Sequence, residues 1–410
     1  MSDFEEALKN AARILSHSQP MQVITHSDVD GIAAGALAQS ALDCTLIIQN
    51  RLSLETISPS QFTLFLDLGS SQLQEIHDTF DRYLIIDHHP SPEYNYQTMV
   101  NPWMYNIDGT RTLCAAATFY RVIRHMDPQH TSLSYLGIVG ALGDRQPLTG
   151  ENETLVEDAH AAGILSNTTL FDQYDLQEFV DIVNACCRNG KKELALKVCL
   201  LQEVEKGRKE LETYNTIFQK DLSYLEENWS EINQENAERS ALFIYSEKIT
   251  QKYAGELATI LARNHDTIII LMAPDANSQG IKISGRATPS LIERGLHLGE
   301  AFSGYGGGHD IAAGAFLESS SMIETFIQVV NKRIHHMMTP ITVTLDIPVP
   351  DAEKVLKALS IDNEGYREIQ IRAENNHILG DISGPPGTVK NTTDDIIACI
   401  ISAIQMMEEE

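Results

Sequence analysis

The sequence predicts an α/β protein of four parts: a parallel-sheet domain, a helical connector, a second α/β domain and a small α+β module. Three observations support this order. Short apolar runs alternate with helical stretches in the first 150 residues, the next part is mostly helical and more charged, and strand patterns return after residue 238. We place the boundaries at 1–150, 151–238, 239–338 and 339–410.

The composition is typical of a globular protein without a membrane anchor. The chain has 410 residues, of which 43% are apolar, enough for ordinary buried cores in about two to four domains. Its longest apolar stretches, Asp266–Pro274 and Ile396–Met407, are too short to cross a bilayer, and the acidic N-terminus does not resemble a secretory signal. Six cysteines without a CxxC pair predict free thiols in a reducing cytoplasm.

The net charge of −27 argues against non-specific attraction to nucleic acid, because an acidic surface repels phosphates. It does not exclude a nucleic-acid substrate, since metal ions and a local basic surface can offset the global charge. A cytoplasm of raised salt concentration is another explanation for the acidity, and the sequence leaves this open.

The first domain is expected to contain a parallel sheet covered on both faces, because near-continuous apolar strands alternate with helices. Residues 3–16 carry one apolar helical stripe that should pack on this domain. The expected strands are Met21–His26, Cys44–Gln49, Thr63–Leu68 and Arg82–Asp87. The expected helices are Gly31–Leu42, Ser71–Phe80 and Thr112–His125.

Histidine and aspartate side chains follow three of these strands where each strand ends. His26, Asp28 and Asp30 leave the first strand at alternate positions. Because ligands gather beyond the carboxyl ends of parallel strands, we expect these side chains at one edge of the sheet. An imidazole and two carboxylates suit a hard cation such as Mn²⁺ or Mg²⁺ better than they suit zinc, which favours thiolates. A surface turn rich in Asp and Gly is the alternative interpretation.

Three further stretches carry residues of the same kinds. Asp67 lies where a buried strand meets a Gly-Ser turn, and capping of the next helix is its alternative role. Asp87, His88 and His89 follow the next apolar strand, and the adjacent histidines should point to opposite sides and differ in function. Asp144 ends a small-residue helix, for which a helix end in solvent is the alternative.

Taken in order, these four stretches resemble the metal-site motifs of the DHH phosphoesterase superfamily. The resemblance implies two metal ions that share Asp67, with Asp87 orienting a ligand histidine and His89 facing the substrate phosphate. The implied ligands are His26, Asp28 and Asp67 for one ion, and Asp30, Asp67, His88 and Asp144 for the other. Two ions about 3.5–4 Å apart can stabilise the attacking and leaving oxygens of an in-line displacement.

The connector is expected to be largely helical from residue 150 to 235. Apolar residues recur at helical spacing from Leu194 to Tyr214, which predicts one long helix. This part is also the most basic of the chain, and a solvated helix face is the default interpretation, with one wall of a nucleic-acid cleft as the alternative. The basic residues concerned are Arg188, Lys191, Lys192, Lys197, Lys206, Arg208 and Lys209.

The α/β pattern returns over residues 240–337. The expected strands are Ala241–Tyr245, Thr267–Met272, Gly280–Gly285 and Ala312–Leu317. The expected helices are Tyr253–Asn264, Pro289–Gly299 and Ser321–His335. A glycine run lies between them, and its bare amides can approach phosphate, a tight turn being the alternative.

These stretches resemble the substrate-binding domain of nucleases of the RecJ and oligoribonuclease type. The resemblance implies that Arg286 and His309 bind the phosphates of a single strand across a cleft from the metal ions. The full set of implied substrate-binding residues is Ser284, Arg286, Gly306, Gly307, Gly308 and His309.

The composition changes again after Pro340. The expected order is strand Ile341–Val349, helix Ala352–Leu359, strand Arg367–Ala373, a turn over Leu379–Lys390 with Gly384–Gly387 at its centre, and helix Asn391–Met407. This order resembles the small dimerising subunit of the KEOPS tRNA-modification complex. The resemblance implies an interaction module, for a homodimer or a protein partner, at residues 339–410. Its few basic residues argue against nucleic-acid binding there.

The leading functional prediction is a cytoplasmic, Mn²⁺- or Mg²⁺-dependent exonuclease on single-stranded DNA or RNA, similar to archaeal RecJ-type enzymes of DNA repair. A hydrolase of short oligonucleotides or cyclic dinucleotides is one alternative, because the same ligands serve it and the acidic charge suits a small substrate. A metal-free replication scaffold is the other, although the ligand residues are all present. The Gly-Gly-Gly-His pattern disfavours a family II pyrophosphatase. The direction of digestion stays open.

Overall fold

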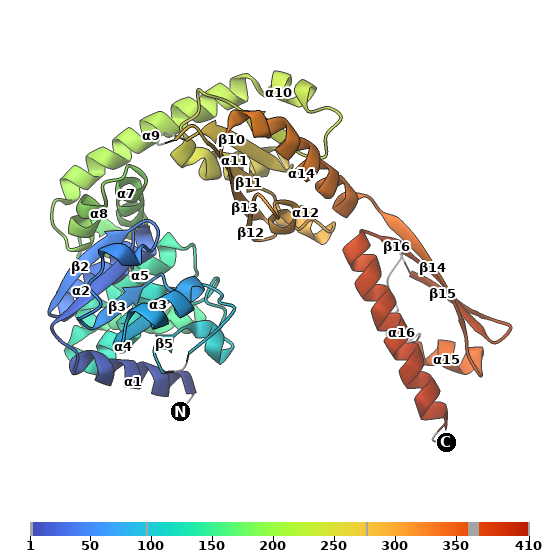
Figure 1. The fold of residues 1–410 in the computed structure, drawn as a ribbon, viewed down its shortest axis with the longest axis horizontal. Helices are drawn as coiled ribbons and strands as arrows, with labels where there is room; N and C mark the ends of the chain where they lie inside the picture. Colours follow the sequence, from blue (N-terminus) through green and yellow to red (C-terminus); the bar gives the residue numbers. More distant parts are fainter. Residues whose placement is uncertain (1–2, 96, 276–277, 360–368, 409–410) are drawn as a thin grey trace. The chain divides into compact units, whose positions relative to one another are not determined.

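The computed structural model describes residues 3–95, 97–275, 278–359 and 369–408 (Figure 1). The chain folds into two compact units, Met1–Thr216 and Ile217–Glu410. The four-part division expected from the sequence is finer than these two units and stays a prediction. Within the described ranges, no helix combines the length and the apolarity needed to cross a membrane, and all six cysteines are free thiols.

The first unit is built on a five-stranded parallel sheet in the order β2-β1-β3-β4-β5. The strands are β1 (Met21–His26), β2 (Cys44–Gln49), β3 (Thr63–Leu66), β4 (Tyr83–Ile86) and β5 (Met99–Val100). The first two coincide with prediction, whereas β3 and β4 end one or two residues early, so Asp67 and Asp87 lie just beyond their strands. The two-residue strand β5 was missed because so short a segment shows no periodicity.

Helices cover both faces of this sheet, as alternating side chains of the buried strands require. Val23, Leu64 and Leu84 face the larger core, and Ile24 and Phe65 face the smaller one. The larger core is formed with α1 (Asp3–Ser16), α2 (Val29–Ala41), α4 (Ala115–Met126) and α5 (Ser134–Gly143), and the smaller with α3 (Leu73–Thr79). All the helices expected in this domain are present within a few residues of their predicted bounds.

The connector is helical but less continuous than predicted. It contains α6 (Glu153–Ala161), α7 (Leu176–Arg188), α8 (Lys192–Cys199), α9 (Val204–Glu227) and α10 (Trp229–Glu235), with a small antiparallel sheet of β6 (Leu165–Ser166), β7 (Thr169–Leu170) and β8 (Tyr174–Asp175). The prediction of a single long helix across Leu194–Tyr214 was wrong. Leu201 and Glu203 adopt left-handed φ angles of 59° and 51°, which separate α8 from α9.

The basic residues of the connector are largely engaged within the first unit. Lys197 and Lys206 lie 3.0 and 2.9 Å from Glu203, Arg208 pairs with Glu178, and Lys192 donates to the Ile48 carbonyl at 2.7 Å. These contacts favour the solvated helix face over a wall of a nucleic-acid cleft, because the positive charges are compensated locally.

The second unit contains a mixed sheet in the order β12-β13-β11-β10-β9. Its strands are β9 (Leu242–Tyr245), β10 (Ile269–Pro274), β11 (Ile281–Arg286), β12 (Gly306–Gly308) and β13 (Ala312–Leu317). Its helices are α11 (Ala254–His265), α12 (Pro289–Glu293), α13 (Leu298–Ala301) and α14 (Ile323–Met338). Gly306–Gly308 of the glycine run therefore form a short strand paired with β13, whereas Gly304 lies in a turn with a φ of +85°. The single helix expected over Pro289–Gly299 is split into α12 and α13 around Gly295, whose φ is +93°.

The C-terminal part has its own three-stranded antiparallel sheet, ordered β14-β16-β15, and its own apolar core. Its elements are β14 (Ile341–Pro348), α15 (Ala352–Leu359), β15 (Ile369–Glu374), β16 (His377–Gly384) and α16 (Pro386–Glu408). The turn expected over Leu379–Lys390 was wrong, because β16 runs to Gly384 and α16 begins at Pro386, a residue suited to a first helical turn. The start of the strand expected from Arg367 lies outside the described residues.

Candidate metal centre

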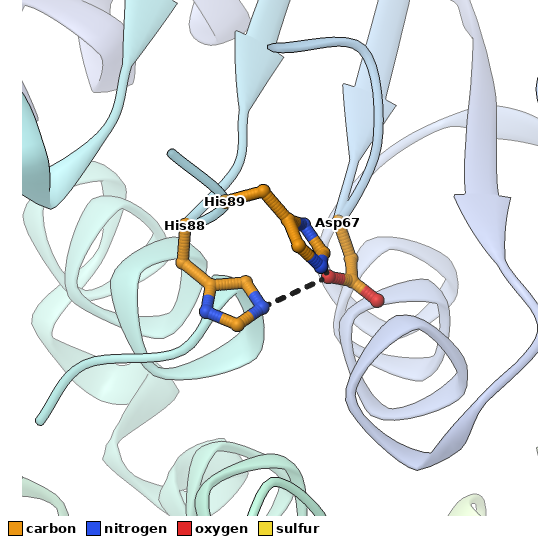
Figure 2. A group of neighbouring side chains, drawn as sticks. All are labelled: Asp67, His88 and His89. Carbon is orange, nitrogen blue, oxygen red and sulfur yellow. Dashed lines mark ion pairs between the residues drawn. The ribbon is translucent and has the colours of Figure 1, made fainter. Parts of the chain in front are cut away.

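Histidine and aspartate side chains from separate segments of the first unit converge beyond the carboxyl ends of β1, β3 and β4. Asp67 follows β3, and His88 and His89 follow β4 (Figure 2). Three groups of these side chains place one potential ligand atom each within 4.8 Å of one another. The groups are His26, Asp28 and Asp67; Asp30, His88 and Asp144; and Asp67, His88 and His89.

In the first group, His26 and Asp28 lie at the junction of β1 and α2, and Asp67 follows β3. His26 Nδ1 is 3.0 Å from Asp28 Oδ2 and 3.3 Å from Asp67 Oδ2, yet this nitrogen is buried without a hydrogen bond of good geometry. Asp28 caps α2, and its other oxygen accepts from the Gly31 N–H at 3.0 Å. Burial alone would lower the pKa of His26, but the Asp28 and Asp67 carboxylates raise it to about 11. The three ligand atoms thus surround a position that suits a cation.

The second group centres on His88. Its Nδ1 donates to the Gly109 carbonyl at 2.8 Å, which leaves Nε2 directed at the carboxylates. Nε2 lies 3.3 Å from Asp67 Oδ1, 3.2 Å from Asp144 Oδ2 and 3.8 Å from Asp30 Oδ2. Burial, and then the neighbouring Asp30, raise the pKa of Asp144 to about 8. The tautomer that His88 needs as a metal ligand is therefore fixed by the backbone.

Asp67 connects the two groups, because one of its oxygens faces His26 and the other faces His88. Both oxygens are buried and accept no hydrogen bond of good geometry. Burial, and then the charges of Asp28 and Asp30, raise the pKa of Asp67 to about 7. A buried carboxylate without donors is costly unless a cation compensates it. Asp67 also holds a left-handed φ of 58°, an uncommon conformation that is typical of functional sites.

Asp87 organises the turn that carries both histidines. Its Oδ1 accepts from the backbone N–H of His88 at 2.8 Å and from His89 Nδ1 at 2.8 Å, while Oδ2 accepts from the Ser70 N–H at 3.0 Å. Burial opposes ionisation of Asp87, but the bond from His89 and the positive charges nearby hold its pKa below the ordinary carboxyl value. His89 remains 54% exposed, and the Asp87 carboxylate raises its pKa against the effect of burial.

Several supporting groups were not found from the sequence. The backbone N–H groups of Ala115 and Ala116, at the start of α4, each donate at 2.8 Å to one oxygen of Asp30. A Cβ atom on Gly140 would stand 2.5 Å from Asp30 Oδ1. Gln146 donates to the same Gly109 carbonyl that holds His88. The sequence holds no signal for these contacts, because they join segments far apart in the chain.

A cavity of about 420 Å³ opens beside the cluster. It is lined by His26, Asp67 and His89, and also by Arg51, which the sequence reasoning did not select. Gly69 lies in its wall with a φ of +111°, a conformation that other residues rarely adopt. The cavity thus places one cationic side chain next to the converging imidazoles and carboxylates.

The substrate-binding residues expected from the resemblance lie in the second unit. Ser284 and Arg286 project from one face of β11, the face that also carries Gly307 of β12. Gly306 and Gly308 take positions of the opposite face. His309 follows β12, and its backbone N–H donates to the Ala312 carbonyl at 2.8 Å. Because Gly306–Gly308 pair with β13, some of their N–H groups are used within the sheet and fewer can bind phosphate.

Two family models match separate parts of the chain. Residues 20–139 match the family model described as the DHH family, N-terminal domain, and residues 239–336 match the DHHA1 domain. An uncharacterised protein of Methanocaldococcus jannaschii is 30% identical over 187 residues. That match covers 40% of this chain and 43% of the relative, so less than half of the relative's length is spanned.

Similar solved structures extend over most of the chain. An exonuclease RecJ bound to manganese is 19% identical with a TM-score of 0.61, covering 80% of this chain and 94% of that one. RecJ from Thermus thermophilus in complex with Mn²⁺ is also 19% identical, with a TM-score of 0.64 and coverage of 88% and 60%. CDC45 from Entamoeba histolytica is 10% identical with a TM-score of 0.51, covering 81% and 98%. At these identities the similarity concerns the fold.

Proposed function

The chain belongs to the DHH superfamily of metal-dependent hydrolases, and we propose that it is a two-metal phosphodiesterase that removes nucleotides from single-stranded DNA or RNA. One observation carries the proposal. The Asp67 carboxylate, buried and without hydrogen-bond donors, lies between two groups of ligand atoms. Such a carboxylate fits a pair of cations better than it fits a structural role in the metal-free protein.

The donor set supports Mn²⁺ or Mg²⁺. The proposed ligand atoms are carboxylate oxygens and two imidazole nitrogens, with no cysteine sulfur among them, which suits hard divalent cations. The proposed ligands are His26, Asp28 and Asp67 for one ion, and Asp30, Asp67, His88 and Asp144 for the other. When bound, the ions would supply charge that activates water and stabilises the phosphoryl oxygens.

His89 is proposed to act on the substrate from the open side of the cluster. Asp87 holds Nδ1 at 2.8 Å, and the ring lines the cavity, so Nε2 can reach a phosphate or a leaving oxygen. The Asp87 carboxylate raises the pKa of His89, which favours the protonated ring that a donor to a leaving oxygen requires. Arg51 lines the same cavity and would pair with a terminal phosphate.

A single-stranded substrate is supported by the second unit and by the fold similarity to RecJ. We propose that Arg286 and His309 contact phosphates, and that Ser284 and the strand Gly306–Gly308 lie beside the bound chain. A reducing cytoplasm, suggested by six free thiols, and a function in DNA repair remain parts of this proposal.

The test is a time course with end-labelled single strands of DNA and RNA. The protein is first treated with chelator and then supplied with Mn²⁺, Mg²⁺ or neither. We expect mononucleotides to appear only with metal, and Asp67→Asn to abolish their release. Survival of both strands in Mn²⁺, with two ions bound, would refute the nuclease assignment.

A hydrolase of short oligonucleotides or cyclic dinucleotides is the second candidate, favoured by the net charge of −27. Acidic surfaces repel long polyanions more than short ones. The same assay decides between them, because this candidate should cut a dinucleotide and leave a long single strand intact. A metal-free scaffold is a weaker alternative, since the ligand residues are present and converge; it would require that the protein bind no Mn²⁺.

A further inference from the structure

One face of the second unit's sheet carries an exposed aromatic ring beside a strip of backbone. Partners in antiparallel register project to the same side of a sheet. Phe316 pairs with Lys282, while Gly314 pairs with Ser284 on one side and with Gly307 on the other. These five positions therefore share a face, and Phe316 is 47% exposed there. We name the Gly307–Gly314 pair the glycine strip.

The apolar core lies on the opposite face, so the ring of Phe316 is not part of it. Ile283 and Leu317, whose positions alternate with these, pack in that core with Phe302 and Phe326. On the face that carries the strip, α11 packs next to Arg286. A Cβ atom on Gly255 of α11 would lie only 2.9 Å from Arg286 Nη2. Gly307, Gly314 and Phe316 are exposed on this face.

The glycines of the strip are not explained by the fold. Neither has a φ in the left-handed region. A Cβ atom on Gly307 would meet no atom of the described residues within 4 Å, and one on Gly314 would meet only the Ile283 carbonyl oxygen, at 3.8 Å. Larger side chains would thus fit and would strengthen the strands. Paired glycines in strand interiors then indicate close approach of a ligand to the backbone.

The ring of Phe316 lies against a third glycine, Gly280. A Cβ atom on Gly280 would collide with Cζ of the ring and would lie 2.8 Å from Cε1. The residue at position 280 must therefore lack a side chain for the ring to lie where it does. The ring therefore contacts Gly280 on one side and is exposed on the other, where a flat partner can cover it.

We propose that Phe316 stacks on a nucleobase of the bound strand while the glycine strip accepts the sugar-phosphate chain against the sheet. This inference rests on the proposed function and adds a base contact to it. The ring is flanked by glycine, Lys282 and Ser284, and Arg286 follows on the same face. A single ring among small and cationic residues suits a base with its phosphates, whereas a protein partner requires a larger apolar area.

The test uses the full chain and a short fluorescein-labelled oligothymidylate. Binding is measured by anisotropy in the Asp67→Asn background, so that the strand is not cut. We expect Phe316→Ala to weaken binding about five- to a hundred-fold and Phe316→Trp to retain it. Gly307→Val, which has room to fold, should also weaken binding by filling the strip. The matched control is Tyr245→Ala, which removes an exposed aromatic from β9 at the opposite edge of the same sheet.

An abasic strand of equal length separates stacking from structural damage. Wild-type binding to it should already be weak, and Phe316→Ala should weaken it no further. Equal losses on both strands, or unchanged binding by Phe316→Ala, would overturn the proposal.

A separate assay keeps the stacking inference distinct from the proposed function. In chains with an intact Asp67, the Mn²⁺ affinity measured by calorimetry should be the same for wild type and for Phe316→Ala. A lower affinity in Phe316→Ala would show that the substitution disturbs the metal centre and would contradict a contact made only to a base. If wild type binds Mn²⁺ but does not cleave a single strand, the proposed function fails, and the anisotropy data alone still decide the stacking.

Discussion

Gly140 lies so close to Asp30 that a Cβ atom on it would stand 2.5 Å from the carboxylate oxygen Oδ1. The same oxygen accepts the Ala116 N–H at 2.8 Å, and the other accepts the Ala115 N–H at 2.8 Å. The start of α4 and the flank of α5 thus hold this carboxylate from two sides. Its position depends on a residue without a side chain, several elements away in the sequence.

Gly140→Ala is therefore expected to weaken Mn²⁺ binding by the group of Asp30, His88 and Asp144 about 10- to 100-fold, the usual effect of disturbing a ligand's support. Calorimetry with Mn²⁺ would report the affinity of each ion. Gly137→Ala is the matched control, because Gly137 lies on the same helix as Gly140. Its added Cβ would lie 2.7 Å from Leu155 of α6 and would touch no metal ligand. Both variants should lose about 1–3 kcal/mol of stability. An equal loss of Mn²⁺ affinity in both would contradict a specific effect on Asp30.

Asp67→Asn is expected to abolish Mn²⁺-supported hydrolysis and to lower the number of bound ions. Asparagine is preferred to alanine here, because it tolerates the φ of 58° at this position. The rise in melting temperature that Mn²⁺ gives the wild type should be smaller in the variant, because a ligand shared by both ions is lost. Asp78→Ala, on the exposed side of α3, serves as control. Full activity in Asp67→Asn would remove Asp67 from the metal centre.

Metal binding and stability should depend on pH in opposite directions. Burial raises the pKa of Asp67 to about 7 and that of Asp144 to about 8 in the metal-free protein. The folded state then holds protons that the unfolded chain has released, so metal-free stability should fall from about pH 4 to about pH 8. Mn²⁺ must displace these protons, and its affinity should rise over the upper part of this range.

Thermal unfolding in chelator, and calorimetry of Mn²⁺ binding in two buffers of different ionisation enthalpy, measure the two effects. The buffer difference counts the protons released. A Mn²⁺ affinity that stays constant between about pH 6 and pH 8 would show that the carboxylates are already ionised without metal.

Arg286→Ala is expected to raise KM for single strands more than it lowers kcat, because a phosphate contact away from the reacting bond is made equally in ground and transition states. Arg286→Lys should recover part of the loss by keeping the charge, but not a bidentate contact. Steady-state kinetics on a labelled strand provide the measurement. Arg372→Ala, which removes an exposed arginine paired with Asp381, is the control. A fall in kcat alone would contradict the proposed role.

The ends of strands could be predicted because buried parallel strands are recognisable as apolar runs, and His26, Asp67 and His88 lie at or just beyond the ends of such runs. The convergence of the ligand-type residues follows from that regularity. The support of Asp30 by Gly140 could not be predicted, since it depends on how α4 and α5 pack. The helix break at Leu201 was missed for a similar reason: apolar spacing continues through a residue whose φ is left-handed. The interaction module resembling a KEOPS subunit stays a prediction.

Strand β12 has a consequence for the behaviour of the protein in concentrated solution. It is the outermost strand of its sheet and consists of Gly306, Gly307 and Gly308. Outermost strands are templates for unwanted pairing between molecules. Three glycines form a short and weak template, because they offer no side chains for a foreign strand to pack against. The three glycines leave this edge strand without side chains and would thereby also protect the protein from aggregation.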